Sequence, residues 1–170
     1  VEIGAGAGKW AAALRSRGLD VVAVDDQSDL PDRGPAAARA AREAGVEAVA
    51  PGTGFEEVLR RPRLYRRALL LVYPPPGPLA AKCLKTYSGD TLIYVGEGRG
   101  GANGDATFFD SLEPKESTMG SAWELRVLEE LAPFSGGHEK LYIFRRRGLP
   151  IKITAPWQER EQQAPSVTER

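Results

Sequence analysis

The chain has 170 residues, the size of one ordinary domain that can bury a sizeable core. Its 23 Lys and Arg balance 23 Asp and Glu, and this zero net charge excludes a surface that is cationic throughout or a long acidic tail. A hydrophobic content of 42% favours a globular over a disordered protein. Within this sequence the single cysteine, Cys83, excludes an internal disulfide, and the single histidine, His138, excludes a site of several histidines around a metal.

Short apolar runs alternate with helical stretches along the chain, which is typical of a parallel α/β sheet. The pattern predicts five strand–helix units followed by two further strands. The expected strands are Val1–Ile3, Val21–Val24, Val46–Val49, Ala68–Tyr73, Thr91–Val95, Trp123–Leu128 and Leu141–Arg145. The expected helices are Lys9–Arg17, Ala36–Ala44, Phe55–Arg61, Leu79–Tyr87 and Asp105–Leu112.

We expect one domain over residues 1–153 and a polar, disordered tail over residues 154–170. The chain begins without Met and inside an apolar strand pattern, so we expect that its natural N-terminus lies further upstream. No apolar run approaches the length of a membrane span. We therefore expect a cytoplasmic protein, although the lack of a targeting signal carries no weight when the front end is missing.

A glycine-rich turn follows the first expected strand, and it can be aligned with two different motifs. Gly6-x-Gly8-x-x-Ala11 satisfies the loose dinucleotide-binding pattern, whereas Glu2-x-Gly4-x-Gly6-x-Gly8 places an acidic residue two positions before three alternating glycines. The glycines alone do not decide between the two. A carboxylate at an apolar strand end is costly unless a cation or several donors meet it, and dinucleotide phosphates would repel it. S-adenosylmethionine offers an ammonium group and no phosphate; the alternative is that Glu2 pairs with a basic residue such as Lys9.

The run Val1-Glu2-Ile3-Gly4-Ala5-Gly6-Ala7-Gly8, followed by an acidic end of the second strand at Asp25-Asp26, resembles the class I S-adenosylmethionine-dependent methyltransferases. The resemblance extends from Val1 to about Arg147. It implies a three-layer Rossmann-like α/β sandwich around a mostly parallel seven-stranded sheet, in the order 3-2-1-4-5-7-6, with an antiparallel last strand.

The same resemblance implies that S-adenosylmethionine is the cofactor and which residues bind it. The turn containing Gly4, Ala5, Gly6 and Gly8 would curl under the methionine portion, and Asp25, with Asp26 beside it, would bind both ribose hydroxyls. A carboxylate suits two vicinal hydroxyls because it accepts with two oxygens and donates nothing. The alternative is that the two aspartates merely begin a turn.

The fourth expected strand ends in Val72-Tyr73-Pro74-Pro75-Pro76, beside the expected position of the methyl group. This run is similar to the Asp/Asn-Pro-Pro-aromatic motif of amino-methyltransferases, but Tyr73 replaces the amide or carboxylate and Pro76 replaces the aromatic residue. We therefore do not expect methylation of a nucleobase or of glutamine. Tyr73 is predicted to face both the cofactor and the acceptor. The proline run is predicted to direct a backbone carbonyl toward them. The alternative is that the prolines simply end the strand.

Three further features lie on the acceptor side of the predicted site. Glu97, directly after the fifth strand, is a candidate general base or binding group for a cationic acceptor, and equally a solvated loop charge. The loop Gly98–Gly104 is rich enough in glycine to move as a lid. His138 is a candidate base, but a histidine in a surface loop is the simpler interpretation.

Two basic runs and the cysteine have simpler explanations. Arg60–Arg67 and Arg145–Arg147 could contact RNA or an acidic partner, but at zero net charge a solvated face is favoured. Cys83 is expected to be a small buried hydrophobic residue.

These observations predict an S-adenosylmethionine-dependent methyltransferase whose acceptor is a small molecule or a protein side chain rather than DNA, with no membrane partner. One alternative is an NAD(P)- or flavin-dependent oxidoreductase that uses the same glycine turn. The other is a non-catalytic, methyltransferase-like binding module, which the departure at Tyr73 favours. The acceptor and the oligomeric state stay open.

Overall fold

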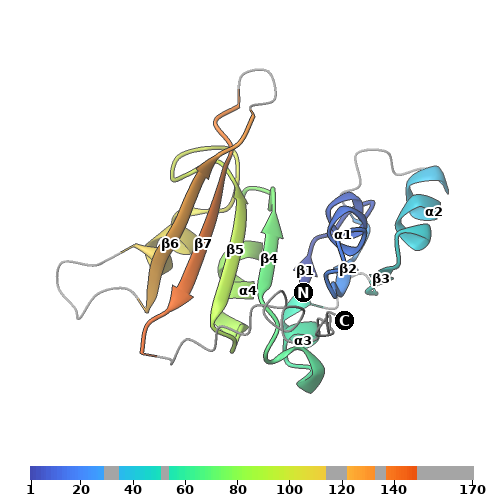
Figure 1. Ribbon diagram of the computed structural model, residues 1–170, viewed down its shortest axis with the longest axis horizontal. Helices are drawn as coiled ribbons and strands as arrows, with labels where there is room; N and C mark the ends of the chain where they lie inside the picture. Colours follow the sequence, from blue (N-terminus) through green and yellow to red (C-terminus); the bar gives the residue numbers. More distant parts are fainter. Residues whose placement is uncertain (29–34, 51–53, 114–121, 133–136, 149–170) are drawn as a thin grey trace, which may run out of the picture.

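A computed structural model describes residues 1–28, 35–50, 54–113, 122–132 and 137–148 of the chain (Figure 1). In this described part, one seven-stranded sheet has the order β3-β2-β1-β4-β5-β7-β6, as predicted. The strands are β1 (Glu2–Ile3), β2 (Ala23–Asp25), β3 (Val46–Ala48), β4 (Leu69–Val72), β5 (Thr91–Gly96), β6 (Trp123–Glu130) and β7 (Lys140–Arg146). The helices are α1 (Lys9–Arg15), α2 (Pro35–Glu43), α3 (Phe55–Leu59), α4 (Leu79–Thr86) and α5 (Ala106–Leu112), with a 3₁₀ turn, η1 (Pro62–Leu64).

The strands β1 to β5 pair in parallel, and β7 lies antiparallel to both of its neighbours, β5 and β6. The carboxyl ends of β1, β2, β4 and β5 therefore meet at one edge of the sheet, and β7 begins at that same edge. Ligands of open parallel sheets bind outside this edge. The register places Gly96 opposite Lys140, so the residues that follow β5 lie beside those that precede β7.

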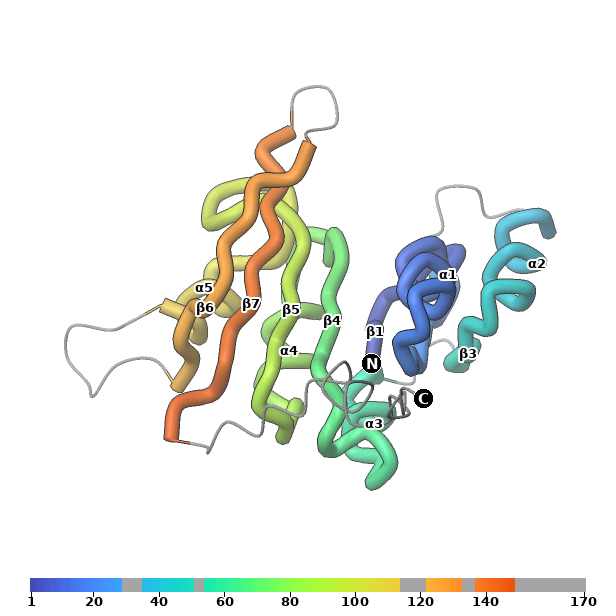
Figure 2. Tube along the Cα trace, in the orientation of Figure 1, coloured from blue at the N-terminus to red at the C-terminus, as the bar shows by residue number. Residues whose placement is uncertain are grey.

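Helices cover the sheet on its two faces, and the alternation of strand side chains explains how. In β2, Ala23 packs with Ala11 of α1 and Ala41 of α2, whereas its neighbour Val24 belongs to the main hydrophobic cluster on the opposite face. That main cluster also takes in the buried residues of α3, α4 and α5, among them Val58, Leu84 and Phe108. Figure 2 shows α4 and α5 behind β4 to β7. The predicted three-layer arrangement is therefore observed.

Several element boundaries differ from the sequence predictions for identifiable reasons. The Asp105 side chain accepts a hydrogen bond from the Phe108 backbone N–H at 2.9 Å, so Asp105 is the N-cap and α5 begins one residue later than predicted. Because β6 and β7 pair as far as Glu130 and Lys140, β6 ends two residues later and β7 begins one residue earlier than predicted. The predicted tail, residues 154–170, lies outside the described residues.

Four of the eight arginines in the two basic runs form ion pairs with acidic residues of the described part. Arg61 and Arg63 both contact the Glu47 carboxylate, and Arg67 contacts Asp20. In the second run, Arg145 lies 3.1 Å from Asp90. These pairs support the interpretation of both runs as balanced surface charge.

Cys83 is 1% exposed, and burial raises the pKa of its thiol to about 12, which agrees with the predicted buried role. A search of the described helices finds none that has both the length and the apolar character needed to cross a membrane.

Candidate functional site

The glycine-rich turn after β1 is folded tightly onto the end of β2. Gly4, Gly6 and Gly8 have φ angles of 72°, 55° and 77°, in the left-handed region that favours glycine. The N–H groups of Gly4 and Ala5 both donate to the Val24 carbonyl, at 3.0 and 3.1 Å, and Gly8 donates to Ala5 at 2.8 Å. The backbone of the turn is thus already hydrogen-bonded within the protein.

Asp25, the last residue of β2, is hydrogen-bonded both to the glycine turn and to the turn that follows β2 itself. Its Oδ2 atom accepts a hydrogen bond from the Gly6 N–H at 2.8 Å, and its Oδ1 atom accepts one from Gln27 at 2.5 Å. Asp25 is 8% exposed, and each carboxylate oxygen can accept more than one donor. The carboxylate therefore lies at the carboxyl end of β2, as predicted, and it also has a structural role that sequence reasoning missed. Asp26 accepts hydrogen bonds from the backbone and side chain of Ser28. Both aspartates thus accept from the backbone N–H two residues later, as the alternative of a turn requires, and Asp25 in addition accepts from Gly6.

Glu2 is a buried carboxyl group with unsatisfied hydrogen-bonding capacity. It is 1% exposed, and its Oε2 atom has no hydrogen-bond partner. Burial raises the pKa of Glu2 to about 7. A hydrogen bond from the Ala11 N–H and the positive charges of the N-terminal ammonium group and of Arg15 lower it, and the Asp25 charge adds a smaller increase. Among the described residues neither Lys9 nor any other basic residue pairs with it. A buried carboxyl group in this condition is costly, and a cation or donor that reached it would remove that cost.

A cavity of about 380 Å³ lies beside Asp26 at the start of α3 and α4. Its walls include Phe55, Leu79 and the run Pro75–Pro78, and the charged residues Glu56 and Lys82 also line it, so charged side chains adjoin a partly apolar space. A flat ring system next to a group with hydroxyls would match this combination. The sequence patterns did not predict the cavity, because it is formed by segments far apart in the chain.

Tyr73 follows β4 directly and has a strained backbone. Its φ angle is 47°, a conformation that costs a residue other than glycine about 1–3 kcal/mol, and its N–H donates to the Val95 carbonyl at 2.8 Å. The side chain is half-buried, and burial followed by the negative charge of Glu139 raises the pKa of its phenol. The structure thus places Tyr73 at the predicted edge of the sheet.

The proline run does not present its first carbonyl to a ligand. The Pro74 oxygen accepts hydrogen bonds from the Gly104 N–H at 3.3 Å and from Asn103 Nδ2 at 3.2 Å. The expectation that a carbonyl of this run aims at the acceptor is therefore wrong for Pro74. Instead, this carbonyl attaches the loop after β5 to the end of β4.

Glu97 lies at the predicted edge of the sheet, but its carboxylate is occupied by backbone donors. Oε2 accepts a hydrogen bond from the Ala102 N–H at 2.7 Å, and Oε1 accepts one from the His138 N–H at 3.3 Å. These two bonds lower the pKa of Glu97, which makes it a weak proton acceptor. The geometry favours a role in fastening two loops over the predicted role of general base. His138 is exposed, as expected of a histidine in a surface loop.

The loop 98–104 is held by several hydrogen bonds, which argues against the expected lid. Asn103 Oδ1 accepts from the Glu97 N–H at 3.0 Å, and Gly101 donates to Gly98 at 3.0 Å. The Tyr94 hydroxyl also donates to the Glu97 carbonyl at 2.5 Å.

Sequence reasoning missed Glu139, which directly precedes β7 at this edge. Its Oε2 atom is buried without a hydrogen-bond partner, and its carboxylate is close enough to Tyr73 to influence the phenol. The hairpin register, which brings residue 140 opposite Gly96, is the signal that would have found it. Two carboxylates, Glu97 and Glu139, therefore lie at the edge of the sheet where an acceptor is predicted.

Among the described residues no group of three or more His, Cys, Asp or Glu side chains could hold a metal ion. Comparison of the chain with protein-family models finds no matching family, and comparison with curated proteins finds no match either.

Proposed function

We propose that this protein is an S-adenosylmethionine-dependent methyltransferase. The observation that carries the proposal is Glu2, a buried carboxyl group whose Oε2 atom has no partner. It lies in β1 directly before the turn of left-handed glycines and close enough to Asp25 for the two charges to interact. Supporting it are the strand order and the antiparallel β7, which agree with what the resemblance to class I methyltransferases implies.

The residues present fit the cofactor chemically. Glu2 and Asp25 supply negative charge for a ligand with a sulfonium and an ammonium group, and Asp25 retains lone pairs for ribose hydroxyls. Gly4 leaves open space above its Cα, because an added Cβ would meet no atom within 4 Å. The cavity beside Asp26 offers apolar walls for the adenine ring.

The cofactor, when bound, supplies an activated methyl group, so transfer to a good nucleophile needs alignment more than a strong base. Tyr73 would orient the acceptor at the end of β4, and the lack of a basic Glu97 does not oppose the proposal. Because Glu97 and Glu139 border this side, a neutral or cationic acceptor is favoured over one that carries phosphates. A small molecule or a protein side chain meets this requirement, and DNA does not.

The nicotinamide alternative is disfavoured by the hydrogen bonds of the turn. A dinucleotide diphosphate is bound by free backbone N–H groups at such a turn. Here the N–H groups of Gly4, Ala5, Gly6 and Gly8 all donate to protein oxygens, and two carboxylates lie next to them.

The proposal is tested by measuring how much S-adenosylhomocysteine, NAD⁺ and NADPH each raise the melting temperature. A ligand at one hundred times its dissociation constant adds about 2.7 kcal/mol to the free energy of unfolding. Of the three ligands, we expect only S-adenosylhomocysteine to raise the melting temperature. If a nicotinamide dinucleotide raises it and S-adenosylhomocysteine does not, the proposal is overturned. Binding of S-adenosylhomocysteine without methyl transfer to any amine, thiol or carboxylate tested would instead favour the non-catalytic module.

A substitution at Asp25 tests the proposed contact between this residue and the ribose. Asp25→Asn keeps a hydrogen-bond acceptor for the Gly6 N–H but removes the charge, and we expect tenfold to hundredfold weaker binding of S-adenosylhomocysteine by calorimetry. Asp20→Asn, at an exposed aspartate outside the site, is the matched control and should bind like the parent. Equal affinity of the Asp25→Asn protein and the parent would show that Asp25 does not bind the ribose.

A further inference from the structure

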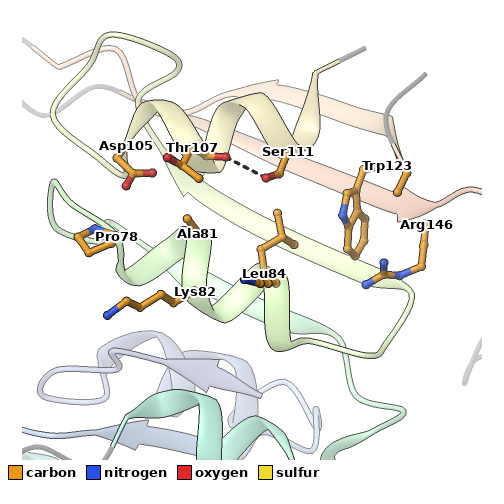
Figure 3. A pocket seen from close by; sticks show the side chains of 11 residues that line it. Pro78, Ala81, Lys82, Leu84, Asp105, Thr107, Ser111, Trp123 and Arg146 are labelled. Atoms are coloured by element: carbon orange, nitrogen blue, oxygen red, sulfur yellow. Dashed lines mark hydrogen bonds between the residues drawn. The ribbon is translucent and has the colours of Figure 1, made fainter. Parts of the chain in front are cut away.

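A groove on the face of the sheet that carries α4 and α5 lies apart from the glycine turn and is not used by the proposed function (Figure 3). Its volume is about 410 Å³, within the range of small-molecule sites. Ala81 and Leu84 of α4 face α5 across it, and Pro78 lies at one end. Trp123, the first residue of β6, closes the other end.

The closed end of the groove is built from well-held aromatic and cationic groups. The Trp123 ring stacks on Tyr87 at a centroid distance of 6.2 Å, and the Arg146 guanidinium lies 4.4 Å from the centroid of the Trp123 ring. Arg146 is fixed by two hydrogen bonds, from Nε to the Gly89 carbonyl at 3.0 Å and from Nη2 to the Tyr87 carbonyl at 2.8 Å. A guanidinium has five N–H donors, so these bonds position the group and leave donors for a ligand.

The charge of the groove is strongly one-sided. Three cations line it, namely Lys82, Lys85 and Arg146. Among the described residues that line it, the only acidic one is Asp105, whose carboxylate already caps α5. Both lysines are exposed on α4, and neither forms an ion pair with another described residue. An apolar groove with an excess of two positive charges is complementary to an apolar molecule that bears a negative charge.

We propose that this groove binds a small amphipathic anion, with its apolar chain or ring between α4 and α5 and its anionic head at the Arg146 and Lys85 end. A carboxylate pairs with the fixed guanidinium, and Leu84 and Trp123 cover the apolar part. The site is independent of the proposed methyltransferase function. The groove and the cavity beside Asp26 share only Pro78 and Lys82, at the start of α4.

Decanoate is a suitable probe, measured by calorimetry and by the tryptophan fluorescence of the whole protein. We expect micromolar binding of decanoate, binding at least tenfold weaker for decyltrimethylammonium and for acetate, and no competition from S-adenosylhomocysteine. Lys85→Glu should weaken decanoate binding at least tenfold. Arg66→Glu makes the same charge change at an exposed residue outside the groove, and the affinity of this variant for decanoate should stay within twofold of that of the parent. Ala81→Leu, which keeps a good helix former and fills the space, should also weaken it.

The proposal is overturned by any of four results. These are no binding of decanoate, equal binding of the cationic analogue, unchanged affinity in Lys85→Glu and Ala81→Leu, and competition with S-adenosylhomocysteine, which would place the anion in the other cavity. If an acidic, leucine-containing peptide binds and decanoate does not, the groove is a peptide-docking surface and the small-ligand assignment is wrong. Since no measurement needs S-adenosylmethionine, failure of the methyltransferase proposal leaves this test intact.

Discussion

At the scale of single residues, the protonation of Glu2 links stability to pH. Its folded pKa of about 7 lies above the ordinary value of 4.5. Below about pH 4.5 the carboxyl is protonated in both states and carries no penalty. As the pH rises from 4.5 through 7 the unfolded chain ionises first, so the free energy of unfolding falls, by at most about 3 kcal/mol.

We therefore expect Glu2→Gln to be more stable than the parent at pH 8 and equally stable at pH 4.5, measured by urea unfolding at both values. The same variant should bind S-adenosylhomocysteine more weakly at pH 8, because the ammonium group loses its carboxylate. A Glu2→Gln protein that is less stable than the parent at pH 8 would show that Glu2 has a strong partner in the folded state.

Tyr73 allows a second prediction at this scale, on backbone strain. Asn tolerates the left-handed region better than Ala does, so Tyr73→Asn should be more stable than Tyr73→Ala by about 0.5–1 kcal/mol, measured by chemical denaturation. Both variants remove the phenol, so the difference between their free energies of unfolding reports how well each residue tolerates the left-handed backbone conformation. If the two are equally stable, the φ angle of 47° is not what limits this position.

At the scale of elements, the glycine turn packs against β3 and the residue Ala44 that follows α2. Substitutions at two of its glycines distinguish the cost of close packing from the cost of the backbone conformation. A Cβ at Gly8 would lie 2.7 Å from both the Ala44 Cβ and the Val46 Cγ2 atoms, whereas one at Gly4 would meet nothing within 4 Å. Both residues have φ angles above 70°. Gly4→Ala should cost about 1 kcal/mol, and Gly8→Ala at least about 2 kcal/mol more, by thermal and urea unfolding. Equal costs would contradict the close packing of the turn.

The loop after β5 can be tested at Asn103, because this side chain hydrogen-bonds both to the residue that follows β5 and to the residue that follows Tyr73. Asn103 accepts a hydrogen bond from the Glu97 N–H and donates one to the Pro74 carbonyl. Asn103→Ala should lower stability by about 1–3 kcal/mol and speed amide exchange over residues 97–104. Asn103→Asp keeps the acceptor and should cost less. Unchanged exchange in Asn103→Ala would show that the other bonds suffice to hold this loop.

At the scale of the whole molecule, the architecture was predictable because it depends on local pattern. The apolar run Leu69–Val72 and the alternation of buried strands with helices are visible in the sequence, and the strand order follows from the resemblance at residues 1–8. The burial of Glu2 and the place of Asp25 were also predictable from strand ends.

The hydrogen bonds at the edge of the sheet were not predictable, because they join residues that are distant in the chain. The Glu97 carboxylate accepts from His138, 41 residues away, and the Pro74 carbonyl accepts from Asn103, 29 residues away. Glu139 lies close to Tyr73 only through the hairpin register. Local patterns carry no information on such contacts, so they placed Glu97 correctly at the edge of the sheet but did not reveal the hydrogen bonds that hold its carboxylate and the loop after it.

The insertion of β7 between β5 and β6 also affects the order in which the protein is built during synthesis. Until residues 140–146 have left the ribosome, β5 has only one strand neighbour, and its other edge is open. Such an edge invites pairing with other chains. A nascent or truncated chain that ends between α5 and β7 should therefore aggregate or require a chaperone, and the edge of the sheet at which Glu139 lies is completed only when β7 has been synthesised.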